Sequence, residues 1–190
     1  VGERFIKKQQ PGLEAQLANL ADELAYNNHD IDDGLRAGLL SFEQLAQVPL
    51  VARHLESVDR LYKKSLTPKQ RRHETVRRLI NALVVDLIET SLRNLDAAAP
   101  KDAGAVRRQK KPLIAFSAAT RAEATELKRF LFEHLYRHHR VYRMNRKAQR
   151  VVRELFEAFY ADPRMLPPEH WDAAKRAEAE SGKAGRAVTV

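Results

Sequence analysis

Apolar residues recur at helical spacing along most of this sequence. After residues 11 and 12, a Pro-Gly pair, one apolar series consists of Leu13, Leu17, Leu20, Leu24 and Ile31. Steps of three, four and seven positions place these side chains on one face of an α-helix. Similar spacings return in the later segments, and alternating strand patterns do not. The sequence therefore predicts an all-α fold.

The predicted helices follow one another with short breaks. In chain order they cover residues 13 to about 34, 49–62, 69–98, 118–138, 140–160 and 169–180. Capping signals stand at two breaks, since Ser41 precedes Gln44 by three positions and Thr67 stands directly before Pro68. Residues 79–88, in the middle of the long helix, are apolar on most sides, so we expect them in the core.

Composition divides the chain into four parts. We expect residues 1–98 to form a first helical part, 99–116 a linker, 117–180 basic C-terminal helices, and 181–190 a disordered tail. The chain opens with Val1, and its first methionine is Met144. We therefore expect it to be a piece or a processed form of a longer protein.

The composition excludes several classes of protein. The 190 residues include no cysteine, which excludes disulfides and thiolate metal sites. With 7 Gly and 8 Pro, the chain has too few turn residues for a collagen-like protein or a β-sandwich. Charged residues make up 31%, and no apolar run approaches the roughly 20 residues of a spanning helix. We expect a soluble, cytoplasmic protein without a membrane partner.

Two kinds of catalytic motif are missing from the sequence. It has no glycine-rich phosphate loop of the GxxxxGK[ST] or GxGxxG type, and no GxSxG nucleophile motif. A kinase, a P-loop ATPase or a serine hydrolase would each lack its defining element. The absence favours a metal-dependent hydrolase, in which an ion activates water and neutralises charge.

The first predicted helix has a polar face with an unusual composition. At about 100° per residue, one narrow sector opposite the leucines holds Asn19, Asp22, Tyr26, Asp30 and Asp33. This sector could be an ordinary solvated face. However, a tyrosine stands among the acids, and the three carboxylates have no Lys or Arg at i,i+4 to relieve their repulsion. A site for a hard metal ion or a polar ligand is the alternative.

Basic residues gather in the second part of the chain. Residues 61–190 carry 28 Lys and Arg against 15 Asp and Glu, and the whole chain has a net charge of +9. On the helix predicted at 140–160, the expected buried stripe is Met144, Val151, Leu155 and Phe159. The opposite side carries Arg143, Arg146, Lys147 and Arg150. This side is either a solvated face or a binding surface for a polyanion, such as single-stranded nucleic acid or a regulatory nucleotide.

Several segments together resemble one known family. They are residues 11–16 (PGLEAQ), 21–36 (ADELAYNNHDIDDGLR), 72–80 (RHETVRRLI), 126–132 (ELKRFLF) and 145–156 (NRKAQRVVRELF). These stretches are similar to the deoxyguanosinetriphosphate triphosphohydrolase family of the HD superfamily. The resemblance covers roughly residues 10–172, and the block at 21–36 is its most specific part.

The resemblance implies a fold, a reaction and a set of site residues. Members of the family are all-helical and cleave a dNTP into deoxynucleoside and triphosphate, with a divalent ion such as Mg²⁺ or Mn²⁺ held by a His…His-Asp…Asp set. By this resemblance, Asp22 is the last Asp of that set. Tyr26 and Asp30 resemble the residues that contact the sugar and phosphates of the substrate.

The sequence also departs from the family pattern. Nothing before Pro11 supplies the first His or the His-Asp pair of the metal set. The dipeptide His29-Asp30 comes seven residues after Asp22 instead of before it, so we do not assign it as the metal pair. The chain therefore resembles the C-terminal portion of such an enzyme, and we expect it to be inactive alone.

Two other kinds of function stay open at this point. The chain could be a helical nucleic-acid-binding module whose acidic helix is only a polar face, or an HD scaffold with a regulatory role and no turnover. Residues 79–88 and 130–136 also offer more apolar surface than one small helical domain readily buries. Together with the family resemblance, this surface predicts a homo-oligomer.

Overall fold

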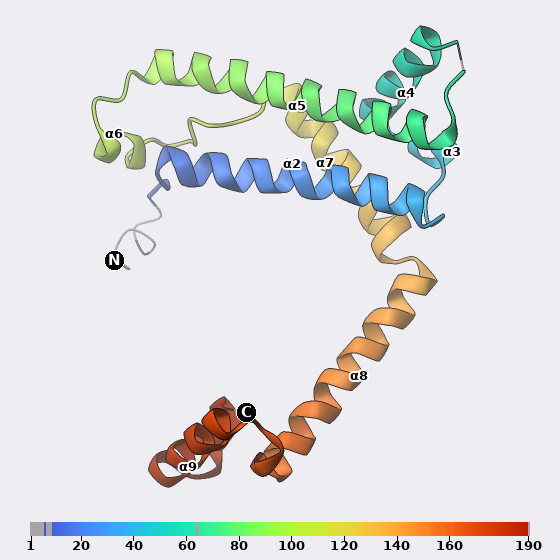
Figure 1. Ribbon diagram of the computed structural model, residues 1–190. Helices are drawn as coiled ribbons and strands as arrows, with labels where there is room; N and C mark the ends of the chain where they lie inside the picture. Colours follow the sequence, from blue (N-terminus) through green and yellow to red (C-terminus); the bar gives the residue numbers. More distant parts are fainter. Residues whose placement is uncertain (1–5, 7–8, 64, 190) are drawn as a thin grey trace. The chain divides into compact units, whose positions relative to one another are not determined.

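The computed structural model describes residue 6 and residues 9–63 and 65–189, with the side chains of residues 183–189 excepted. Within this described part every regular element is helical and no strand occurs (Figure 1), so the predicted all-α fold class is confirmed. Contacts divide the chain into two compact units, Val1–Arg137 and His138–Val190. Each unit is described by itself.

The first unit is built from helices that match the predicted ranges closely. In chain order its elements are α2 (Leu13–Arg36), α3 (Phe42–Leu45), α4 (Pro49–Leu61), α5 (Pro68–Ala98), α6 (Ala103–Arg107), α7 (Ala118–Leu131) and the π-helical turn η1 (Phe132–Tyr136). Helices α2 and α5 run side by side, and α4 and α7 also pack within this unit (Figure 1). The long predicted helices therefore enclose one core.

Both predicted capping signals are confirmed. The Ser41 Oγ accepts a hydrogen bond from the Gln44 N–H at 3.2 Å, and the Gln44 Oε1 accepts one from the Ser41 N–H at 2.8 Å. Thr67 and Gln70 form the same reciprocal pair at the start of α5. Each box satisfies N–H groups that the first turn of a helix leaves without a partner.

The core of the first unit lies where α2, α4, α5 and α7 meet. Its most deeply buried side chains are Ile31, Leu45, Val51, Leu79, Leu127 and Leu131. Helix α5 buries Leu79, Leu83 and Leu87, which lie four residues apart. Val85 and Ile88 on its other side are exposed, so the expectation for residues 79–88 holds for one face of the helix only.

The segment between α5 and α7 packs tightly against the first unit. Leu113, Ile114 and Phe116 in it are buried. The Gln16 Oε1 on α2 accepts from the N–H groups of Leu113 at 2.8 Å and Ile114 at 3.1 Å. The α5 side chains of Ser91 and Asp86 accept hydrogen bonds from two more backbone N–H groups of this segment. Residues 99–116 were predicted as a linker, whereas the division between the compact units falls after Arg137.

The second unit contains α8 (His139–Ala161), the short 3₁₀-helix η2 (Pro163–Met165) and α9 (Pro168–Thr189). The backbone of α9 is interrupted at Gly182, whose φ of 63° lies in the left-handed region that favours glycine. A helical segment continues from there to Thr189, in the range predicted as a disordered tail, and Val190 lies outside the described residues.

The predicted buried stripe of α8 is wrong. None of the helix's residues is buried: Met144 is 62% exposed, Val151 and Leu155 are also exposed, and Phe159 is only partly buried. The period of the stripe is helical as predicted. No described element of the second unit covers this stripe. The short helix η2 contacts α8, and α9 packs mainly against η2. Among the described residues no helix is both long and apolar enough to span a membrane.

Candidate functional site

The polar face of α2 is the best candidate site in the first unit. Asp22, Tyr26 and Asp30 stand at successive turns of this helix, away from the buried side chains of Leu24 and Ile31. Asp22 is exposed, Tyr26 is 57% exposed, and Asp30 is partly buried. The helix therefore presents a carboxylate, a phenol and a second carboxylate along about two turns of its surface.

The neighbouring carboxylates of α2 are engaged by basic side chains. Glu23 pairs with Arg121 at 3.0 Å and with Lys128 at 3.7 Å. Asp32 accepts from the Arg72 Nε of α5 at 2.7 Å.

Asp33 also has a basic partner, which the sequence reasoning missed. It pairs with Arg36 at 2.7 Å. Arg36 stands at i,i+3, where helical side chains also meet, whereas the expectation of unrelieved repulsion rests on i,i+4 partners. Among the described residues, Asp22 makes no hydrogen bond or ion pair. Asp22 is therefore the α2 carboxylate of this sector whose oxygens are free for a ligand.

Asp30 forms a hydrogen bond with a tyrosine that stands near the C-terminal end of the first unit. The hydroxyl of Tyr136, on η1, donates a hydrogen bond to the Asp30 Oδ2. Burial raises the pKa of the Asp30 carboxyl, and the bond from Tyr136 opposes this rise. Burial and the bond to Asp30 also raise the pKa of the Tyr136 phenol, so it keeps its proton at neutral pH. The rings of Tyr26 and Tyr136 lie 6.3 Å apart between centroids.

The described residues do not form a complete metal site. No group of three or more His, Asp or Glu side chains among them has an arrangement that could hold an ion. Asp22 offers a single carboxylate, whereas hard divalent ions in proteins take several oxygen or nitrogen ligands. The described residues therefore do not fit a metal ion without further ligands.

A second candidate surface is the basic side of α8. Arg143, Arg146, Lys147 and Arg150 are all exposed, as predicted from the helical period. Arg150 lies 3.5 Å from Glu154, and the Arg146 Nη1 donates to the Gln149 Oε1 at 3.4 Å. Arg143 and Lys147 make no hydrogen bond or ion pair within the described part of the chain. Their charges are available to an anionic ligand.

Comparison with known proteins bears on both surfaces. The family described as Phosphohydrolase-associated domain matches residues 114–189. A deoxyguanosinetriphosphate triphosphohydrolase-like protein of Bordetella pertussis is 60% identical over 170 residues, which cover 90% of this chain and 44% of that protein. Proteins of the same name from Ralstonia nicotianae and Nitrosomonas europaea are 53% and 46% identical over 90% of this chain, and 43% and 45% of their own lengths are covered.

The chain belongs to the deoxyguanosinetriphosphate triphosphohydrolase-like family. The resemblance predicted from the sequence is thereby confirmed, and with it membership of a family of phosphohydrolases. The chain spans less than half the length of the curated relatives that it matches. The match to the Phosphohydrolase-associated domain includes α7, η1, α8 and α9, so the basic surface of α8 lies inside it.

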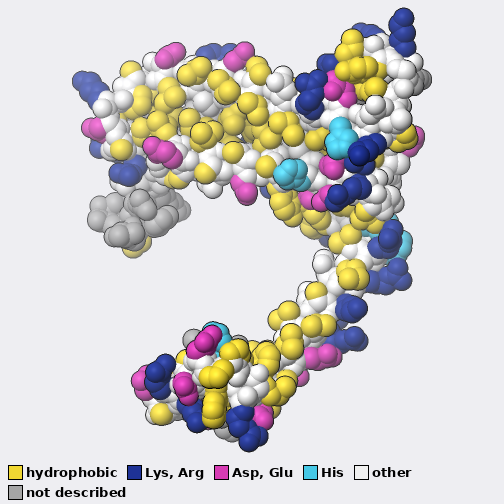
Figure 2. All heavy atoms as spheres, viewed as in Figure 1, with side chains coloured by type: hydrophobic (Ala, Val, Ile, Leu, Met, Phe, Trp, Pro, Cys, Tyr) yellow, Lys and Arg dark blue, Asp and Glu magenta, His cyan; other side chains and the backbone are white. Residues whose placement is uncertain are grey.

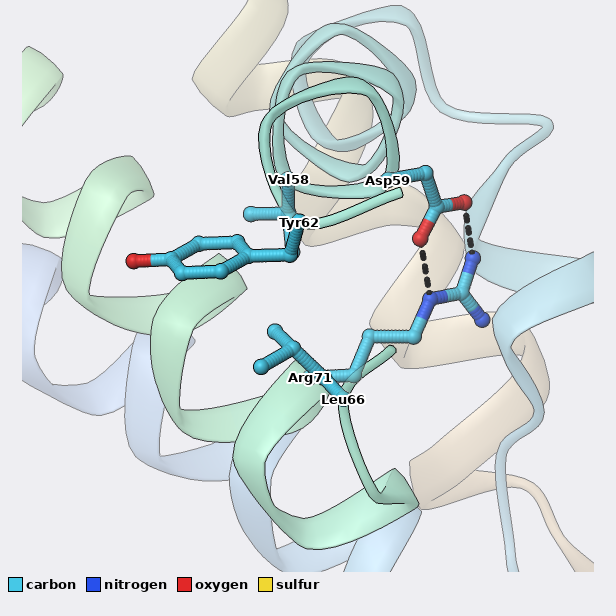
Figure 3. A pocket seen from close by; sticks show the side chains of 5 residues that line it. All are labelled: Val58, Asp59, Tyr62, Leu66 and Arg71. Atoms are coloured by element: carbon cyan, nitrogen blue, oxygen red, sulfur yellow. Dashed lines mark hydrogen bonds and ion pairs between the residues drawn. The ribbon is translucent and has the colours of Figure 1, made fainter. Parts of the chain in front are cut away.

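A pocket between α4 and α5 in the first unit does not add to the candidate site on α2. It has a volume of about 230 Å³ and is lined by Val58, Asp59, Tyr62, Leu66 and Arg71 (Figure 3). The Arg71 guanidinium binds both oxygens of Asp59, at 2.8 and 2.6 Å, and lies over the ring of Phe42 at 4.3 Å. Because the charged groups of Arg71 and Asp59 bind each other, we interpret this pocket as part of the packing between α4 and α5.

Tyr136 is the residue of this candidate site that sequence reasoning missed. It stands 106 residues after Asp30, and no local pattern connects the two. The signal in the sequence nearest to it is the aromatic run around Phe132, which predicts apolar surface for oligomerisation. The hydrogen bond to Asp30 depends on the packing of η1 against α2.

Proposed function

We propose that this chain forms part of a metal-dependent enzyme that hydrolyses a dNTP, such as dGTP, to deoxynucleoside and triphosphate. The observation that carries the proposal is the free carboxylate of Asp22 on α2, in line with Tyr26 and Asp30, in a chain that belongs to the triphosphohydrolase-like family. Its neighbours Glu23, Asp32 and Asp33 pair with basic side chains, whereas Asp22 makes no ion pair with the described residues. An exposed carboxylate without a partner is suited to an ion or a polar ligand.

The three residues of the α2 face have separate roles in this proposal. Asp22 supplies one oxygen ligand to a divalent ion such as Mg²⁺ or Mn²⁺, and the other ligands come from outside this chain. When bound, the ion supplies an activated water and charge neutralisation at phosphate. The exposed Tyr26 hydroxyl orients the nucleotide. Asp30 accepts a hydrogen bond from the substrate through the oxygen that Tyr136 leaves open.

The test of this function is the identity of the products. The full-length protein, incubated with dGTP and Mn²⁺ or Mg²⁺, is expected to release deoxyguanosine and triphosphate in equal amounts, measured by anion-exchange chromatography. Release of pyrophosphate or single phosphate, or no turnover with any dNTP, would contradict the proposal. The 190-residue chain by itself is expected to show no turnover, because one carboxylate cannot hold an ion in a catalytic geometry.

A specific observation also favours binding of a polyanion by α8. Its exposed basic side carries Arg143 and Lys147, which have no partner among the described residues, and no acidic residue stands between residues 137 and 153. Single-stranded nucleic acid or a regulatory nucleotide would be bound through its phosphates, without base readout. This second function is compatible with the first, since it uses a different helix. Binding without any dNTP hydrolysis would instead favour a nucleic-acid-binding or regulatory module.

The exposed apolar face of the first unit supports the proposal of a homo-oligomer. Apolar side chains gather over α2 and α5 (Figure 2), and the large aliphatic ones that are exposed are Leu17, Val84, Val85, Ile88 and Leu92. A contiguous apolar surface of this kind marks an interface in many soluble proteins. We expect a second copy of the protein to bury part of it.

A further inference from the structure

The hydrogen bond between Tyr136 and Asp30 connects two segments that lie far apart in the sequence. Asp30 stands in the last two turns of α2, and Tyr136 is the last residue of η1. Both belong to the first compact unit. This bond fixes the Asp30 carboxylate, because no basic side chain in the described part of the chain forms an ion pair with it.

The π-helical turn is what directs Tyr136 toward α2. If α7 continued as a regular α-helix, Tyr136 would lie roughly 180° around the axis from the buried Leu127, nine residues earlier. A turn with i→i+5 hydrogen bonds accommodates about one extra residue, which rotates the following side chains back toward the buried side. Leu135 is accordingly buried and Tyr136 partly buried. Such turns occur frequently at functional sites.

A close approach at Gly34 brings η1 against the end of α2. A Cβ atom at Gly34 would lie 2.6 Å from the Leu40 Cδ1 and 3.4 Å from the Leu135 Cδ1. Glycine is therefore required there because of Leu40, whereas Leu135 lies at an ordinary van der Waals distance. Tyr136 follows Leu135 directly, and Asp30 lies one turn before Gly34, so the packing of Leu135 beside Gly34 places the Tyr136 phenol near the Asp30 carboxylate.

Two aromatic neighbours hold the Tyr136 ring in place. Its centroid lies 6.3 Å from that of Tyr26 and 6.4 Å from that of Phe132, with the Phe132 ring at 67° in an edge-on arrangement. These two ring contacts limit rotation of the phenol about its side-chain bonds. The hydroxyl consequently keeps one direction, toward Asp30.

We propose that Tyr136 is a positioning residue for Asp30: its hydroxyl fixes one carboxylate oxygen and leaves the other directed to the substrate. The role rests on the proposed function, in which Asp30 contacts the nucleotide. A protonated phenol can only donate to an ionised carboxylate, so Asp30 stays an acceptor in a single orientation. Without Tyr136 the carboxylate would rotate freely and take up a proton more easily.

The charged surroundings of Asp30 allow this effect to be measured. Asp33 raises the pKa of the Asp30 carboxyl and His29 lowers it, and both belong to α2. From η1, the Tyr136 hydroxyl lowers it through the hydrogen bond, while burial raises it. Tyr26 interacts with the phenol of Tyr136. Removal of the Tyr136 hydroxyl therefore changes one contribution and leaves the burial and the charges of His29 and Asp33 in place.

The first experiment uses the 190-residue chain and the variant Tyr136→Phe, with the Asp30 carboxyl carbon followed by NMR during a pH titration. We expect the midpoint for Asp30 to rise by about one pH unit. Tyr62→Phe is the matched control, because the Tyr62 hydroxyl also donates to a carboxylate, that of Glu74 at 3.3 Å, on other helices. An unchanged Asp30 midpoint in Tyr136→Phe would overturn the proposal.

The second experiment compares the same two variants in the full-length protein with dGTP as substrate. For Tyr136→Phe we expect kcat/KM to fall about tenfold, with the acidic limb of its pH profile moved to higher pH, whereas Tyr62→Phe keeps both. Equal kinetics for the two variants would overturn the positioning role. If the unsubstituted full-length protein hydrolyses no dNTP, the proposed function fails, and the NMR titration still decides whether Tyr136 controls Asp30.

Discussion

Gln16 offers a sharp test of how the first unit is held together. Its side chain is 4% exposed. Its Oε1 accepts from the Leu113 and Ile114 N–H groups at 2.8 and 3.1 Å, and its Nε2 donates to the Pro11 carbonyl at 2.8 Å. The side-chain amide of Gln16 thus connects the segment before α7 to α2 by hydrogen bonds. Gln16→Ala would leave two buried backbone N–H groups without an acceptor.

The cost of this substitution follows from the number of groups left unpaired. A buried donor without a partner costs about 1–3 kcal/mol, so Gln16→Ala is expected to lower the free energy of unfolding by about 2–4 kcal/mol. That is a large part of the 5–15 kcal/mol typical of a folded domain. Urea unfolding followed by circular dichroism measures the loss, with the exposed Gln47→Ala as control.

Hydrogen exchange localises the effect of Gln16→Ala. The amide protons of Leu113 and Ile114 should exchange much faster in the variant, while those of α4 should change only with global stability. A loss of less than about 1 kcal/mol, or unchanged exchange at these two amides, would refute the reasoning. It would show that water or a shifted backbone replaces the Gln16 side chain at no cost.

Three further predictions concern charge and apolar surface. The hydrogen bond from Arg77, with Arg78 beside it, lowers the pKa of Glu74 to about 2 from the ordinary 4.5; its stabilisation is therefore present above pH 4.5 and lost as pH falls toward 2, so thermal melts of Glu74→Gln should depend less on pH in that window than those of the unsubstituted chain. The triple variant Arg146→Glu, Lys147→Glu and Arg150→Glu on α8 should bind single-stranded DNA more weakly, with a flatter salt dependence and no loss of helix content. Unchanged binding with the same salt slope would mean that this surface is only a solvated face. Ile88→Lys, at a position that is 53% exposed, should shift sedimentation of the full-length protein toward smaller species. If the unsubstituted protein already sediments as a monomer, the prediction of a homo-oligomer is wrong.

Local sequence signals predicted the helices of this protein well. The leucine series after Gly12 and the capping boxes of Ser41 and Thr67 act within one or two turns, and the structure confirms each of them. The α2 face could also be located from sequence, because helical period alone places Asp22 and Tyr26 away from the leucines. These features depend only on neighbouring residues.

The features that could not be predicted depend on contacts between distant segments. Gln16 looks like an ordinary polar residue in the sequence, and only the fold brings it to Leu113. Tyr136 reaches Asp30 only because a π-turn replaces the regular helix. The stripe around Met144 shows the converse case: an apolar face predicts that something should cover it, and the period cannot say which element does so.

The central claim is that Asp22 holds the ion of a dNTP triphosphohydrolase, and Asp22→Asn in the full-length protein tests it most directly. The substitution keeps the size of an exposed side chain and removes its charge, so the helix content and melting temperature should hardly change. Mn²⁺ binding, measured by calorimetry, and release of triphosphate from dGTP are expected to be lost together. Triphosphate release at the unsubstituted rate, with Mn²⁺ affinity unchanged, would contradict the claim.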